Sequence, residues 1–208
     1  MKIPSIGFTR LCVFDLATLS LNMTAPADFS VPGTLSWSPA GESMAYATRS
    51  PDVSGAEVDD VWLVDAMTGQ RVLIGHGVSP TWLPDGSQIA ILAGPPFPAS
   101  EVSLKIISVP KLTTEQTLAG SWLSRLDSYS WRPTDGLLTV ASSLDPLGSD
   151  IKTQKVLGVD VKLQRVTEFR AQTALSILSN PRWSFDGNLL AVNARPNYLF
   201  SATPLNGV

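Results

Sequence analysis

The feature that most constrains this chain is a short hairpin pattern that occurs four times. Each copy has a tryptophan, a turn rich in Pro, Asp and Gly, and then an apolar segment. The copies are LSWSPAGESMAYAT from Leu35, PTWLPDGSQIAILA from Pro80, YSWRPTDGLLTVAS from Tyr129 and PRWSFDGNLLAVNA from Pro181. Repetition of this kind predicts a structure built from equivalent units stacked beside one another.

The register of the four copies is constant. Apolar residues stand seven and nine positions after each tryptophan, with Ala or Thr between them, which is typical of a strand packed on both faces. The turn ends in Gly, which tolerates a positive φ, and the third copy has its Gly one position later, so we expect an altered turn there. The repeat signature comprises Trp37, Trp82, Asp85, Gly86, Trp131, Trp183, Asp186 and Gly187.

A second hairpin follows the first in each unit. VWLVDAMTGQRVLI has a polar turn from Asp65 to Gly69, VLGVDVKLQRVTEF has Asp160 at the same place, and CVFDLATLSLNMT has Asp15 near the start of the chain. Each unit therefore holds four antiparallel strands. A single such sheet cannot bury both faces, so the units are expected to pack radially as blades. A β-sandwich is the alternative, although a sandwich does not need a repeated register.

The stretch PTWLPDGSQIAILA resembles the WD-like β-propeller repeat of the TolB family, and the turn from Asp65 to Gly69 belongs to the same repeat. The similarity runs from about Leu11 to Ala194. It implies an all-β fold, a β-propeller of four-stranded antiparallel blades. Propellers of TolB type usually have six blades, and those of prolyl oligopeptidase-like enzymes have seven or eight.

The repeat predicts a single β-propeller domain or propeller fragment over residues 1–208. We expect a half-blade at 11–33, blades at about 34–77, 78–120 and 121–172, and a half-blade at 173–208. The two half-blades are complementary, so they could combine into a fourth blade and close a four-blade ring. The alternative is part of a ring of six to eight blades.

Charge and composition exclude few classes of protein. The net charge of −3 argues against nucleic-acid binding, which needs clustered Lys and Arg. The single Cys12 excludes an internal disulfide, and no apolar run is long enough to span a bilayer. The N-terminal segment is a poor signal peptide because Asp15 interrupts it. The resemblance to TolB implies the bacterial periplasm, and the sequence does not exclude the cytoplasm.

The sequence predicts no catalytic, metal-binding or cofactor-binding residue. His76 is the only histidine, no Gly-x-Ser-x-Gly motif surrounds a serine, and phosphate-loop and dinucleotide motifs are absent. We interpret His76 as a residue of the connection between two blades. The tryptophans are interpreted as packing between blades, and the turn aspartates as turn-forming residues.

Non-repeating loops are the better candidates for function. The segments RSPDVSGAEVDD, AGPPFPASEV and SSLDPLGSDIKT are predicted to emerge on one face. The leading hypothesis is a non-enzymatic scaffold that binds a protein partner, not nucleic acid, through this face. The alternatives are the gating propeller of a prolyl oligopeptidase-like serine hydrolase and a propeller that binds carbohydrate or a small ligand. The candidate partner-binding residues are Asp52, Glu57, Asp59, Asp60, Glu101, Asp145 and Asp150.

Overall fold

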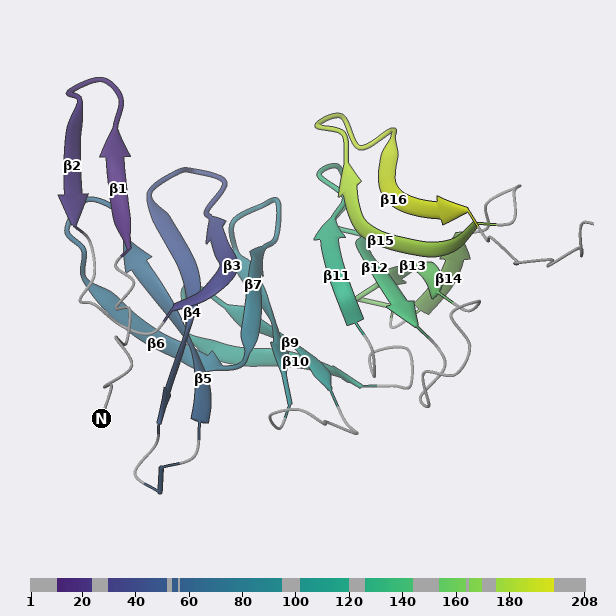
Figure 1. Ribbon diagram of the computed structural model, residues 1–208, viewed down its shortest axis with the longest axis horizontal. Coiled ribbons are helices and arrows are strands. Elements are labelled where there is room, and N and C mark those ends of the chain that lie inside the picture. The colour runs from purple at the N-terminus through teal and green to yellow at the C-terminus, as the bar shows by residue number, and fades with distance from the viewer. Residues whose placement is uncertain are drawn as a thin grey trace, which may run out of the picture.

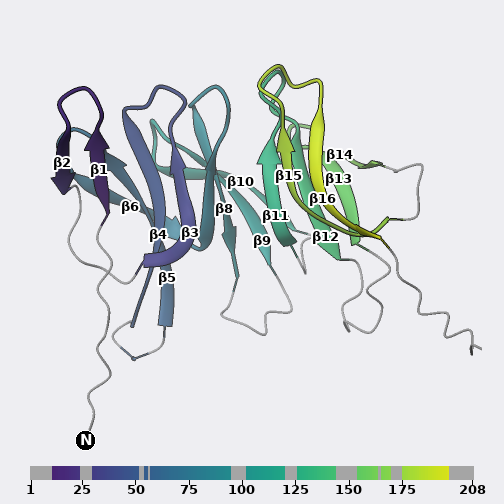
Figure 2. The ribbon, with the colours of Figure 1, turned by 45° about the horizontal axis from the view of Figure 1, so that its top comes forward.

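The computed structural model describes residues 11–23, 30–51, 54–55, 57–94, 102–119, 126–143, 154–163, 165–169 and 175–196. Within these ranges the regular structure is entirely β, in sheets that stand side by side (Figure 1). Three four-stranded antiparallel sheets form blades 1, 2 and 3 in chain order, and a two-stranded hairpin stands at each end of the array (Figures 1 and 2). The predicted all-β, four-stranded blade architecture is confirmed.

The strands follow one another within each blade without crossover. The N-terminal hairpin contains β1 (Cys12–Asp15) and β2 (Ser20–Met23). Blade 1 contains β3 (Ser30–Trp37), β4 (Ser43–Pro51), β5 (Glu57–Asp65) and β6 (Arg71–His76). Blade 2 contains β7 (Val78–Trp82), β8 (Gln88–Ala93), β9 (Ser103–Ser108) and β10 (Thr113–Ala119). Blade 3 contains β11 (Leu126–Trp131), β12 (Leu138–Ser143), β13 (Gln154–Asp160) and β14 (Arg165–Phe169). The C-terminal hairpin contains β15 (Leu175–Trp183) and β16 (Leu190–Pro196).

The repeated turn closes in the same way in three of the four copies. Gly41, Gly86 and Gly187 all have positive φ, and each donates its N–H to the carbonyl three residues earlier. In the third copy the positive φ falls on Gly136, whose N–H bonds the carbonyl of Arg132, four residues earlier. The loop keeps its length while its internal hydrogen bond widens by one residue, which confirms the altered turn.

The alternation of side chains along the second strand of each blade buries both faces of the sheet. In β8, Ile89 and Ile91 lie in a cluster shared with blade 1, while Ala90 lies in a cluster shared with blade 3. Small residues in this intermediate position allow neighbouring sheets to approach closely. The positions seven and nine after each tryptophan therefore face the preceding blade, and the position between them faces the following one.

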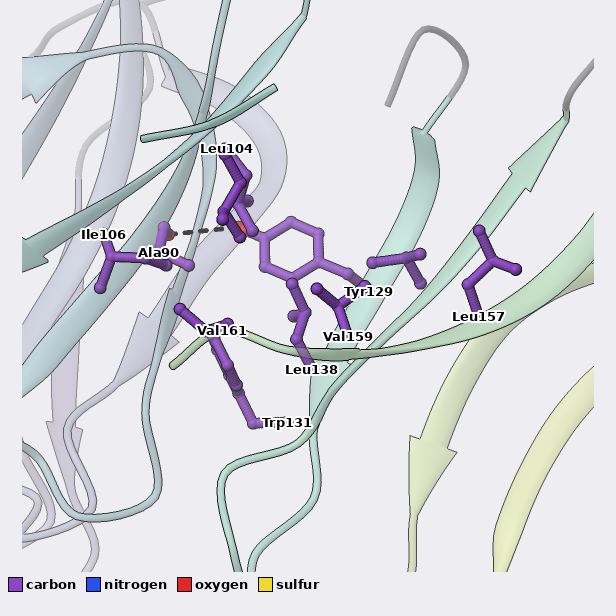
Figure 3. Close-up of a cluster of buried hydrophobic side chains, with 11 residues drawn as sticks. Ala90, Leu104, Ile106, Tyr129, Trp131, Leu138, Leu157, Val159 and Val161 are labelled. Carbon is purple, nitrogen blue, oxygen red and sulfur yellow. Dashed lines mark hydrogen bonds between the residues drawn. The ribbon is translucent and has the colours of Figure 1, made fainter. Parts of the chain in front are cut away.

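The contact between blades 2 and 3 is the largest of the buried clusters (Figure 3). Tyr129 inserts its ring among Leu104 and Ile106 of blade 2 and Leu138 of its own blade. Its hydroxyl donates to the carbonyl of Ala90 at 3.2 Å and to that of Ser79. Burial raises the pKa of Tyr129, so this phenol stays neutral and keeps both blades joined.

The two half-blades do not combine in this structure. The N-terminal and C-terminal hairpins form separate two-stranded sheets and lie at opposite ends of the array (Figures 1 and 2). The fourth blade that would close a four-blade ring is therefore not formed within the described chain. Strand β3 also begins at Ser30, a few residues before the blade boundary expected at 34.

Candidate functional site

The strand ends that adjoin the non-repeating segments lie on one side of the array, which we call the loop face. It is formed by the paired ends of β4 and β5, of β8 and β9, and of β12 and β13, all of which point the same way in Figure 2. The connection from β6 to β7 reaches the same face, because His76 at the end of β6 pairs with Asp60 near the start of β5.

An ion pair joins β4 and β5 of blade 1 at the loop face. Arg49 and Asp59 are opposite one another in the β4–β5 ladder. The Arg49 Nε donates to Asp59 Oδ1 at 2.7 Å and its Nη2 donates to Oδ2 at 3.0 Å. This two-bond geometry fixes both side chains, while the Arg49 side chain remains 48% exposed. The pair therefore presents a fixed, solvent-accessible cation beside a carboxylate.

A second pair lies one residue further along β5. The Asp60 carboxylate is 2.7 Å from Nδ1 of His76, so Nδ1 carries the hydrogen and donates it. The His76 side chain is 68% exposed and that of Asp60 only 18%. The less exposed Asp60 carboxylate thus orients the imidazole of His76, and Nε2 of the ring remains available at the loop face.

The structure places only part of the predicted acidic set. Glu57, Asp59 and Asp60 belong to strand β5, because the β4–β5 ladder extends outward as far as Pro51 and Glu57. The expectation that they lie in an exposed loop is wrong for these three. Asp59 and Asp60 are also each bound to a basic side chain, so they do not form a bare acidic surface. The remaining candidates lie outside the described residues, namely Asp52, Glu101, Asp145 and Asp150.

Sequence reasoning missed Arg49 and gave no role to the link between Asp60 and His76. The signal for Arg49 was available in principle. Once Ser43 is set opposite Asp65, counting along both strands brings Arg49 opposite Asp59. The link from β5 to β6 includes a register shift between Val61 and Trp62, so no simple count could place His76.

The turn aspartates act on their own backbones. Asp85 accepts from the N–H and hydroxyl of Ser87, and Asp186 accepts from the hydroxyl of Ser184 and the N–H of Asn188. These bonds hold the pKa of both carboxyls below the usual value, with the Ser87 N–H and the Ser184 hydroxyl as the main causes. Their geometry matches the turn-forming role expected from the sequence.

The tryptophans of the repeat have different environments. Trp82 is 8% exposed and its Nε1 donates to the carbonyl of Ser36 in the preceding blade at 3.2 Å. Trp183 donates to the hydroxyl of Thr139 in blade 3 at 2.9 Å, and Trp131 is buried between blades 2 and 3. Trp37 differs, because 44% of it is exposed. Three of the four thus pack on the preceding blade, as expected.

Other kinds of site find little support in the described ranges. There, no three His, Cys, Asp or Glu side chains come together as metal ligands. The described part of the chain also contains no helix that is long and apolar enough to cross a membrane.

No protein-family model and no curated protein matches this sequence. Solved structures do. A putative TolB from Agrobacterium tumefaciens matches with a TM-score of 0.60 and 19% identity over 85% of this chain and 62% of the other. The β-propeller domain of the Trilobed protease from Pyrococcus furiosus, described as having an open velcro topology, matches with a TM-score of 0.54 and 16% identity over 74% and 46%.

A chain of the mitotic checkpoint complex matches with a TM-score of 0.54 and 18% identity over 92% of this chain and 51% of the other. In all three cases this chain spans less than two thirds of the matched structure. At these identities the comparisons show the fold. The chain is built from the blades of a β-propeller, the fold of the putative TolB and of the other two matched structures.

Proposed function

We propose that the protein is a non-enzymatic scaffold that binds a protein partner through the loop face. The observation that supports this most is the Arg49–Asp59 ion pair and the adjacent Asp60–His76 hydrogen bond, held at the ends of blade strands. They stand where the non-repeating loops leave a repeated framework, which is the usual location of binding residues.

The geometry suits recognition of a polar protein surface. The guanidinium of Arg49 and the imidazole of His76 are both oriented by a less exposed carboxylate, so little side-chain entropy is lost when a partner binds. Arg is also enriched in protein interfaces because it combines several donors with a planar surface. The matching chain of the mitotic checkpoint complex agrees with a propeller that works in an assembly.

The test exchanges the charges of one pair while keeping their attraction. In the double variant Arg49→Asp, Asp59→Arg the ion pair can re-form, and an exposed pair contributes only about 0.2–1 kcal/mol in any case. The thermal midpoint should therefore change by at most about 2–4 °C. Partner affinity should fall roughly tenfold or more, because each cation and carboxylate would now meet a like charge.

The control exchanges an equivalent pair on the opposite side of the array. Lys111 and Glu115 form an exposed ion pair 3.2 Å apart across the turn from β9 to β10. The double variant Lys111→Glu, Glu115→Lys should capture partners from an extract of the source organism as well as the unaltered chain does. Capture would be measured by quantitative mass spectrometry and confirmed by titration with the purified partner. Equal capture by both double variants would refute binding through the loop face.

A second candidate function is the gating propeller of a serine hydrolase. Likeness to the propeller of a protease supports it. On this hypothesis the loop face would contact a catalytic domain encoded in the same gene. Sequencing the complete open reading frame tests the idea, since a frame without a hydrolase domain would exclude it.

A further inference from the structure

The two terminal hairpins each expose apolar positions that complete blades bury. Phe14 in β1 is 53% exposed, whereas the equivalent residues Val64, Ile107 and Val159 are at most 1% exposed. In β16, Ala191 is exposed, whereas the equivalent Ala45 and Ala90 are 0% exposed. Each hairpin thus has the surface of half a blade.

The adjoining end of blade 1 is also incomplete. The indole of Trp37 is 44% exposed, while Trp82 in the same position of blade 2 rests on the first two strands of the preceding blade. The N-terminal hairpin covers part of blade 1, through Val13 against the cluster of Met44 and Tyr46. It consists of only two strands, which match the third and fourth strands of a blade.

We propose that the C-terminal hairpin of a second copy of this chain pairs with the N-terminal hairpin to form a complete blade. The register follows from the complete blades. In the three complete blades, the residue seven positions after the repeat tryptophan pairs with the residue just before the second turn, which begins at Asp65, Ser108 or Asp160. These pairs are Met44↔Val64, Ile89↔Ile107 and Leu138↔Val159. Applied to the hairpins, this rule pairs Leu190 with Phe14, Ala191 with Val13 and Val192 with Cys12.

This arrangement accounts for the exposure of Phe14, Ala191 and Trp37 at the two ends. Phe14 and Cys12 would face blade 3 of the second copy, as the equivalent residues of complete blades face the preceding blade. Ala191 would face blade 1, where the exposed Trp37 needs a surface to pack on. The free edges of β1 and β16 would be hydrogen-bonded instead of open to uncontrolled pairing.

A second copy is favoured over closure within one chain because the hairpins lie at opposite ends of the array (Figure 1). Within the described residues each copy has three complete blades, and two copies would form two shared blades between them. A head-to-tail contact of this kind closes as a ring when the rotation fits. The inferred assembly is an eight-blade ring of two copies.

The first experiment uses the single natural cysteine. In the variant Val192→Cys, the new thiol would lie opposite Cys12 of the other copy, where facing Cβ atoms are about 4.5–5.5 Å apart. Mild oxidation should give a covalent dimer of about 44 kDa, twice the 22.2 kDa of one chain. The control Ala191→Cys points to the other face of the strand and should not cross-link.

Three results would overturn the proposal. The first is an oxidised monomer with no free thiol, which indicates closure within one chain. The second is equal cross-linking of Val192→Cys and Ala191→Cys, and the third is an absence of cross-linked dimer.

The second experiment needs no cross-link. Sedimentation velocity of the unaltered chain should show a species of two copies, and Phe14→Glu should convert it to one copy. Leu16→Glu is the matched control, since Leu16 is 79% exposed in the turn of the same hairpin and should leave the dimer intact. A monomer, a species larger than two copies, or a dimer insensitive to Phe14→Glu would refute the shared blade.

Discussion

Gly77 lies at the junction of blades 1 and 2, and adding one methyl group there should strongly lower the free energy of unfolding. Its φ is +153°, a conformation that other L-residues rarely adopt, and its N–H donates to the carbonyl of Asp59 at 2.8 Å. A Cβ at this position would lie 2.2 Å from the carbonyl oxygen of Leu92 and 3.4 Å from the Cα of Ala93. These are backbone atoms of β8, so the contact can be relieved only by moving the strand.

The expected cost of Gly77→Ala combines two effects. Backbone strain contributes about 1–3 kcal/mol, and forcing an extra methyl into a filled space contributes about 1–3 kcal/mol. We expect the free energy of unfolding to fall by about 4 kcal/mol, the sum of mid-range values. With a urea dependence of about 2 kcal/mol per M, the unfolding midpoint should fall by about 2 M.

Gly86→Ala is the matched control. Gly86 also has a positive φ, +72°, but a Cβ there would be 3.7 Å from the nearest atom, which belongs to Pro39. Only the left-handed conformation is penalised, at about 1 kcal/mol. Both variants would be unfolded in urea at one protein concentration and followed by tryptophan fluorescence. A midpoint for Gly77→Ala equal to or above that of Gly86→Ala would refute the close-contact argument.

Three further predictions concern hydrogen bonds between and within blades. Trp82→Phe should lower the free energy of unfolding by about 1–2 kcal/mol, because the carbonyl of Ser36 loses its donor; no change in urea unfolding would contradict this. Because the pKa of Tyr129 is raised, its contribution to the free energy of unfolding is complete below about pH 10 and is lost as pH rises further. Tyr129→Phe should remove this alkaline loss of stability from unfolding curves measured at pH 8–11. Hydrogen bonds from the N–H and hydroxyl of Thr68 lower the pKa of Asp65. The contribution of Asp65 to the free energy of unfolding should therefore be present above about pH 4 and decline as pH falls through the lowered pKa. Asp65→Asn should flatten this decline, and an unchanged dependence of the unfolding free energy on pH would contradict the prediction.

The loop face shows how far sequence reasoning could reach towards the site. The repeat correctly separated structural residues such as Asp85 from segments that do not repeat, because turn chemistry is local. It could not show that Asp59 and Asp60 are already bound to Arg49 and His76. Those contacts depend on how far the β4–β5 ladder extends and on a register shift between β5 and β6, which residue types alone do not specify.

By itself the sequence determined the blade. Alternation with period two, Gly at positive φ and Asp accepting from its own turn are local effects, and they recur wherever the motif recurs. Tertiary structure alone decided what each blade meets. Trp37 and Trp82 occupy the same position of the repeat, yet one is 44% and the other 8% exposed. Burial is a property of neighbouring sheets, so identical motifs acquire different environments according to which strands stand beside them.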